Sequence, residues 1–144
     1  RVLQVVPPVA LRLIERVLIV DAGITGQLGV YASGVVRLGT DALRVRQPDR
    51  QFASRLSIFS GTVLHEIGHA VYHRLLTTAQ RFAAESLYLD SQQAETDGVA
   101  ELAAEEAEHH FVALFVAAAA GISYGPFGPA SVREMLANLG VPMR

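Results

Sequence analysis

Residues 63–71 of the chain read Val-Leu-His-Glu-Ile-Gly-His-Ala-Val. His65 and His69 are four residues apart, so in a helix both imidazoles leave one face about one turn apart, as two ligands of a single zinc ion require. Glu66 is placed to take a proton from a water molecule on that zinc, which lowers the pKa of the water to about 7. The pattern is typical of zinc metallopeptidases and predicts a catalytic zinc site with Glu66 as its general base.

The residues around this motif favour a functional site over an accidental match. The motif lies in an apolar amphipathic stretch, where two histidines and a glutamate would otherwise need buried partners. Gly68 costs a helix about 1 kcal/mol relative to alanine, so we expect a strand or the partner helix to approach closely there. The histidines of the chain all fall in the two regions predicted as long helices: His65, His69, His73, His109 and His110.

Two further observations narrow the class of zinc site. Tyr72 and Leu75 stand where the extended pattern of the metzincins has glycine and histidine, which excludes that class. His73 lies two helical turns beyond His65, about 12 Å along the axis, which is too far for both to bind one ion. We therefore interpret His73 as a residue outside the ligand set, at the surface or in support of a ligand.

The third protein ligand is expected from the second long helix. That region carries a run of acidic residues, most of which should face solvent: Glu95, Asp97, Glu101, Glu105, Glu106 and Glu108. In an antiparallel helix pair, residues equidistant from the turn face each other, and for Glu108 and residue 67 the midpoint falls beside an expected turn at 88–91. Glu108 also has the most apolar neighbours at helix spacing, so it is the predicted ligand. Glu101 requires an earlier turn, near 78–80, and is the alternative.

The first third of the chain reads as short, mixed elements. The two prolines at 7 and 8 open a short helix that extends to about residue 16. Val17–Val20 is a compact apolar run and is predicted as a buried strand. Two strands at 28–31 and 35–38 are predicted to form a hairpin, and 43–46 is either another short strand or a loop.

The remainder of the chain is predicted to be helical. An apolar stripe at helix spacing runs from residue 56 to residue 89, as one helix or as two pieces broken at Thr77-Thr78. Asp90-Ser91 is a helix start signal for a second long helix, which runs to about Ala120 and ends at the following glycine. Ser131 is expected to cap a last short helix. The fold class that follows is α+β: a small mixed sheet packed on a long helical hairpin that carries the zinc site.

Composition bounds the function further. With 144 residues the chain is the size of one domain, so we predict a single domain over 1–144. The net charge is −2 and the basic residues are scattered arginines, which gives no groove for nucleic acid. The absence of cysteine excludes disulfides and thiolate ligands. The longest apolar run, 111–122, is too short to span a membrane. No signal peptide is visible, and the start at Arg1 suggests a domain excised from a longer protein.

The motif at 63–71, followed later by Glu-Glu-Ala-Glu-His-His-Phe-Val-Ala-Leu-Phe at 105–115, resembles the gluzincin-type zinc peptidases of the anthrax lethal factor and Pro-Pro endopeptidase group. Residues 28–38 are similar to the strand pair that precedes the zinc helix in that group. The resemblance implies a zincin-like fold, peptide-bond hydrolysis with Glu66 as base, and the zinc ligands His65, His69 and Glu108. A shift of one residue puts His109 in the third ligand's place, and the frame 100–105 puts Glu101 there.

The sequence thus predicts a zinc metallopeptidase whose polypeptide substrate is added as a strand along residues 29–38, so that its backbone groups are paired. No nucleic acid is expected as a partner. Two alternatives stay open: a non-catalytic zinc-binding module with the same fold, and the peptidase part of a toxin or effector protein.

Overall fold

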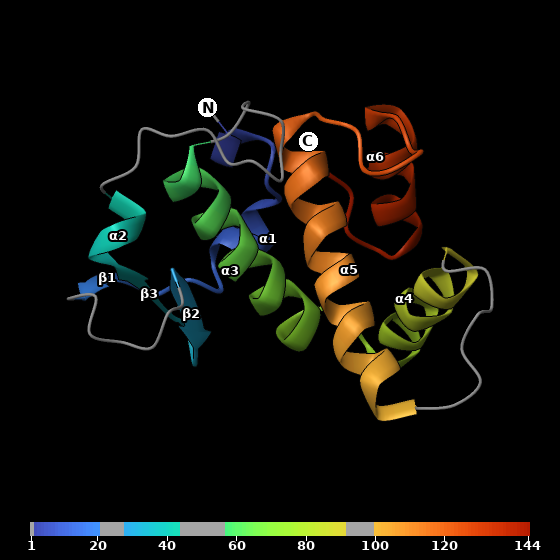
Figure 1. Cartoon of the computed structure of the whole chain (residues 1–144), viewed down its shortest axis with the longest axis horizontal. Helices are drawn as coiled ribbons and strands as arrows, with labels where there is room; N and C mark the ends of the chain where they lie inside the picture. Colours follow the sequence, from blue (N-terminus) through green and yellow to red (C-terminus); the bar gives the residue numbers. More distant parts are fainter. Residues whose placement is uncertain (1, 21–27, 44–56, 92–99) are drawn as a thin grey trace.

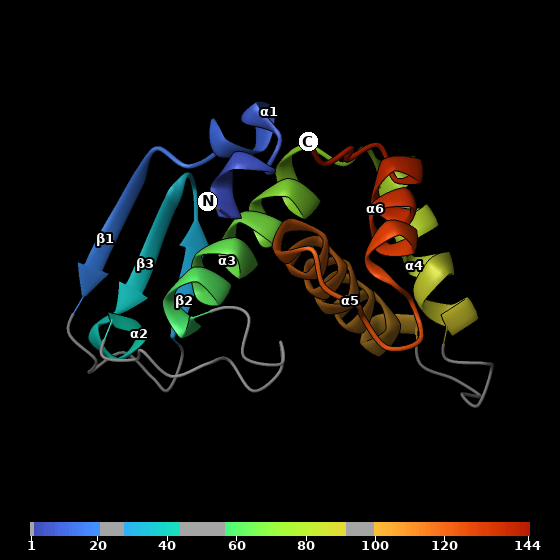
Figure 2. The same cartoon turned by 90° about the horizontal axis from the view of Figure 1, so that it is seen from above.

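The computed structural model describes residues 2–20, 28–43, 57–91 and 100–144 (Figure 1). The elements are, in order, the 3-10 turn η1 (Val2–Gln4), α1 (Pro8–Leu11), β1 (Arg16–Val20), β2 (Gly29–Ala32), β3 (Val35–Gly39), α2 (Thr40–Leu43), α3 (Ile58–Arg74), α4 (Thr78–Ser91), α5 (Ala100–Ala120) and α6 (Pro129–Asn138). The sheet lies at one end of the molecule, with α3 beside it and α5 beyond α3 (Figure 2). This arrangement confirms the predicted α+β class.

The sheet has three strands in the order β1-β3-β2. β3 pairs in parallel with β1 and antiparallel with β2, so the sheet is mixed, as predicted. The hairpin of β2 and β3 is confirmed, with Ser33 and Gly34 at positive φ in its turn. Such backbone angles are what a tight two-residue hairpin turn requires.

The strand predicted at 17–20 forms, but the prediction that it is buried is wrong. β1 lies at the edge of the sheet and pairs, among the described strands, with β3 alone. Its side chains are largely exposed, and Ile19 reaches 58% exposure. An apolar run predicts a strand, but not how many neighbours it has.

Two other N-terminal predictions need correction. The helix opened by the prolines, α1, ends at Leu11, because β1 begins at Arg16. A short helix, α2, follows β3 directly and was not predicted. The strand or loop predicted at 43–46 lies mostly outside the described residues, since 44–56 are not described.

The long apolar stripe forms two helices, α3 and α4, as the prediction of a break at Thr77-Thr78 allowed. Thr77 and Gln80 build a capping box at the start of α4: the Gln80 N–H donates to Thr77 Oγ1 (3.2 Å), and the Thr77 N–H donates to Gln80 Oε1 (2.8 Å). The predicted apolar stripe does not continue along the buried side of α4, since Phe82, one of its members, is 69% exposed.

The last two helices match their predicted ends better than their starts. α5 ends at Ala120, where Gly121 takes a φ of 67°. Ser91, expected to start that helix, is the last residue of α4. α6 begins at Pro129 with Gly128 as its N-cap, so Ser131 lies inside the helix. Prolines favour the first helical turn, and this preference decides the start.

α3 and α5 pack against each other and run antiparallel, since Gly68 meets Val112 while His73, further along α3, contacts Glu108, which comes earlier in α5. The sequence predicts a turn at 88–91 that connects these two helices directly. That connection is wrong, because α4 lies between α3 and α5 in sequence and packs on α5.

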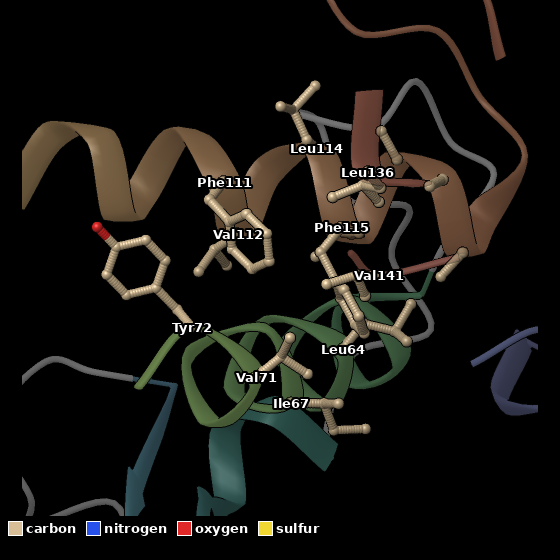
Figure 3. Close-up of a cluster of buried hydrophobic side chains, with 14 of the residues drawn as sticks. Leu64, Ile67, Val71, Tyr72, Phe111, Val112, Leu114, Phe115, Leu136 and Val141 are labelled. Atoms are coloured by element: carbon tan, nitrogen blue, oxygen red, sulfur yellow. The ribbon is translucent and has the colours of Figure 1, made fainter. Parts of the chain in front are cut away.

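The core is centred on α5. Leu64 and Val71 of α3 pack toward Phe111 and Phe115 of α5, whereas Ile67 points to the other side of α3 (Figure 3). Every residue of α5 from 111 to 119 is buried, because α3, α4 and α6 surround it. Among the described residues, no helix is both long and apolar enough to cross a membrane.

The predicted close approach at Gly68 is confirmed, and the neighbour is the partner helix. A Cβ atom at Gly68 would lie 3.1 Å from Val112 Cγ1 and 3.4 Å from Val112 Cα. Glycine therefore sets how near α3 comes to α5, and with it the distance between the histidines of α3 and the polar end of α5.

Replacing Gly68 by leucine is expected to lower the free energy of unfolding of the metal-free protein by about 1–3 kcal/mol, because the side chain has no room beside α5. Urea denaturation measures the effect. The double variant Gly68→Leu/Val112→Ala should recover part of the loss, since the smaller side chain makes space. A single variant as stable as the wild type would contradict the tight contact.

Candidate metal centre

His65 and His69 are brought together by the regular geometry of α3. The helix starts at Ile58, seven residues before His65, and its N-cap is Ser57, whose side chain accepts a hydrogen bond from the Ser60 N–H. Both histidines lie in unbroken helix, where residues four apart share a face. His65 Nε2 and His69 Nε2 are 3.0 Å apart, and both side chains are half-buried. The sequence prediction that these two imidazoles converge is consistent with this placement.

Glu66 points to the sheet and is only 5% exposed. Its carboxylate lies against β2, where a Cβ atom on Gly29 would come within 2.9 Å of Glu66 Oε1. Burial raises the pKa of Glu66, while the nearby charge of His69 and a hydrogen bond from the Tyr31 backbone N–H lower it. The glycine thus leaves room for the carboxylate, and the strand holds it beside the two histidines.

Glu108 connects α5 to two histidines of α3. Its Oε1 atom lies 2.5 Å from His69 Nδ1 and 2.7 Å from His73 Nε2. Burial raises the pKa of Glu108, but the hydrogen bonds and charges of His69 and His73 outweigh it, and the pKa lies below its ordinary value. The carboxyl group is therefore ionised at neutral pH and accepts hydrogen bonds from both rings.

His69, His73 and Glu108 form a group that could hold a metal ion. Each offers one ligand atom, and these atoms all lie within 4.8 Å of one another. His69 also faces His65 through its other ring nitrogen. A metal ion could therefore bind on either side of the His69 ring. His65 lies at its Nε2 atom, and Glu108, which also contacts His73, lies at its Nδ1 atom.

The structure places the alternative third ligands as follows. The ring of His109 lies 5.6 Å from the ring of His69 and 6.5 Å from that of His65, between centroids, and its side chain is exposed. Glu101 belongs to α5, but its side chain lies outside those that the structure describes. Glu105 and Glu106 are exposed, which agrees with the expectation that most of the acidic run faces solvent.

His110 is a core residue. Its ring lies between those of Tyr88 and Tyr124, with centroid distances of 5.6 and 5.4 Å. Burial lowers its pKa, so the ring is neutral at neutral pH. The Tyr88 hydroxyl donates to Glu106. His110 is thus separated in role from its neighbour His109, which faces the histidines of α3.

The sequence interpretation places His73 outside the ligand set, at the surface or in support of a ligand, and its exposed ring contacts Glu108. Its distance from His65 excludes a shared ion, but the four-residue spacing of His65 and His69 is repeated by His69 and His73. That repeat brings His73 to Glu108 and into the candidate metal group. The second spacing was the signal that could have identified it.

No protein-family model matches the chain, and no curated protein or solved structure matches it significantly. Its chemistry must therefore be read from its own residues: a His-His-Glu group that could hold a metal ion, with a further histidine and a buried glutamate beside it.

Proposed function

We propose that the protein is a zinc-dependent hydrolase, and within that class a metallopeptidase. His65 and His69 bind the zinc, the Glu108-His109 segment of α5 supplies the third ligand, and Glu66 is the general base. The observation that carries the proposal is the 3.0 Å separation of the two Nε2 atoms, with a buried carboxylate on the next residue of the same helix. Two nitrogen ligands of one zinc ion lie about 3.0–3.4 Å apart.

The donor set supports zinc as the metal. Imidazole nitrogens with a carboxylate nearby suit zinc, whereas magnesium and calcium prefer sites made of oxygen ligands. The chain has no cysteine, so a thiolate site is excluded. Three protein ligands would leave a place for water, as catalytic zinc sites do.

The chain's own residues can perform the proton transfers of hydrolysis. Bound zinc would polarise the scissile carbonyl and make water acidic. Glu66 accepts the proton of the attacking water and then delivers it to the leaving amine. Burial raises the pKa of Glu66 and so makes it a stronger base, while the Tyr31 N–H keeps its carboxylate in place.

Two features support a polypeptide as substrate. Residues 63–71 and 105–115 resemble gluzincin peptidases, and among the described strands β2 is an edge strand beside Glu66. An extended peptide would pair with β2, Gly29–Ala32. β3 is paired on both sides, with β1 and with β2. Residues 35–38 belong to β3, so this part of the predicted binding segment 29–38 has no free edge for a peptide strand.

The proposal predicts one tightly bound zinc per chain. The protein is freed of metal with a chelator and titrated with zinc by calorimetry, and the metal content is checked by mass spectrometry. The loaded and metal-free forms are then incubated with a proteome-derived peptide mixture. Zinc-dependent cleavage at a one-to-one stoichiometry is expected. A folded protein that takes up no zinc would overturn the proposal.

A non-catalytic zinc module is the second candidate. It is favoured by the short contacts of Glu108 with His69 and His73, because these contacts hold the carboxylate and both imidazoles together in one group. The same experiment separates the two, because this alternative predicts bound zinc with no cleavage of any peptide.

A further inference from the structure

Three imidazole rings lie close together between α3 and α5. The ring centroids lie 4.7 Å apart for His65 and His69, 5.6 Å apart for His69 and His109, and 6.5 Å apart for His65 and His109. A zinc–nitrogen bond of about 2.1 Å places the ring centroids of two imidazoles on one ion roughly 5–6 Å apart. The His65–His69 and His69–His109 spacings are therefore close to those of a zinc site, whereas the nearly parallel rings of His65 and His109 require the exposed His109 ring to turn before all three bind one ion.

Glu108 stands on the opposite side of the His69 ring from His65. Its ionised carboxylate accepts hydrogen bonds and donates none, so the proton of a neutral His69 ring lies on Nδ1. The lone pair is then on Nε2, which faces His65 Nε2. Histidines that bind metals commonly have this arrangement, in which the other ring nitrogen is held by a carboxylate.

The interatomic distances also distinguish metal ligands from residues that only form hydrogen bonds. Two ligand atoms on one zinc ion lie about 3.0–3.4 Å apart. The Nε2 atoms of His65 and His69 meet this spacing, at 3.0 Å. Glu108 Oε1 is 2.5 Å from His69 Nδ1 and 2.7 Å from His73 Nε2, which are the distances of charge-assisted hydrogen bonds.

We propose that the metal's protein ligands are His65, His69 and His109, and that Glu108 is a positioning residue that fixes the tautomer and orientation of His69. His73 shares the carboxylate with His69 and does not bind the metal. This inference rests on the proposed function and specifies its metal site. It differs from the ligand set predicted from the sequence, where Glu108 was the third ligand. It also gives the metal three neutral ligands, so the ion keeps its full charge to act on water.

The rival arrangement uses the other nitrogen of His69. A metal among His69 Nδ1, His73 Nε2 and Glu108 Oε1 would exclude His65 and His109 from the ligand set. The two arrangements therefore predict opposite effects for His73 and His109, while both require His69.

The test compares zinc affinity and zinc X-ray absorption spectra of the full chain and five variants. His109→Ala should weaken zinc binding on the order of 100-fold and reduce the imidazole count in the spectrum from about three to about two. Glu108→Ala should weaken binding about 10–100-fold with three imidazoles retained, and Glu108→Gln should weaken it less, because glutamine keeps an acceptor for His69. His73→Ala should change affinity less than about threefold. Glu105→Gln, an exposed change on the same helix, is the matched control.

Two results would overturn the inference. If His73→Ala and Glu108→Ala both release the zinc while His109→Ala binds it with an unchanged spectrum, the metal lies on the Nδ1 side and this inference is wrong; zinc-dependent cleavage by the wild type would then still support a hydrolase, with a different ligand set. If the wild-type chain binds no zinc, the proposed function and this inference fall together. Because His109 is exposed, His109→Ala is expected to fold, and circular dichroism confirms it.

Discussion

Glu66→Gln is expected to lower kcat/KM for peptide hydrolysis about a thousandfold while the protein keeps its zinc. General bases contribute about 10²–10⁴-fold to rate, and an amide cannot accept the proton of the attacking water. The change preserves shape in a position that is 5% exposed, and the Tyr31 N–H can donate to the amide oxygen as it does to the carboxylate. Steady-state kinetics on a cleaved peptide, together with metal analysis, measures both properties.

Stability serves as the control for this variant. Burial raises the pKa of Glu66 in the folded state, so the stability it contributes in its protonated form is present below the unfolded pKa and is lost as pH rises through the folded pKa. At neutral pH the metal-free Glu66→Gln protein should therefore be at least as stable as the wild type. Near-normal cleavage by Glu66→Gln would show that another group is the base, and a variant that has lost its zinc would show that Glu66 supports the metal.

The second large effect is expected at His69. His69→Ala should weaken zinc binding by at least about a thousandfold, because His69 offers Nε2 on the side of His65 and Nδ1 on the side of Glu108. No arrangement of the metal described above survives without this ring. Zinc titration with a competing chelator measures the loss, and hydrolysis should disappear with it.

His65→Ala and His73→Ala are the matched comparisons, since they remove the histidines one turn before and one turn after His69 on the same helix. We expect His65→Ala to lose most of its zinc affinity and His73→Ala to keep it. A His69→Ala protein that still binds zinc with wild-type affinity would place the metal elsewhere and contradict the proposed site.

The part of the site that lies on one helix could be predicted from the sequence. Helix geometry alone sets the distance between His65 and His69, because four residues make about one turn. The close approach at Gly68 could be predicted for a similar reason: a glycine inside a helix needs a neighbour to justify its cost. In both cases the cause is local, and the structure agrees.

The contribution of α5 could not be predicted in the same way. Residues 111–119 are apolar and all buried, so they carry no stripe that would fix the rotation of the helix about its axis. Rotation decides whether Glu108 or His109 faces the histidines of α3, and it is set by packing against α3, α4 and α6. The burial of β1 was mispredicted for a related reason, since a strand's exposure depends on how many neighbours the sheet provides.

The contact between His69 and Glu108 joins residues that are 39 positions apart in the chain. Under the proposed function, bound zinc adds a second tie between the same two helices in a chain that has no cysteine for a disulfide. A permanent crosslink over such a span removes about 4 kcal/mol of loop-closure entropy from the unfolded state. A metal tie works only while the ion is bound, and its strength grows with free zinc. Zinc supply would then govern how long each molecule survives proteolysis and heat, in addition to whether it can act.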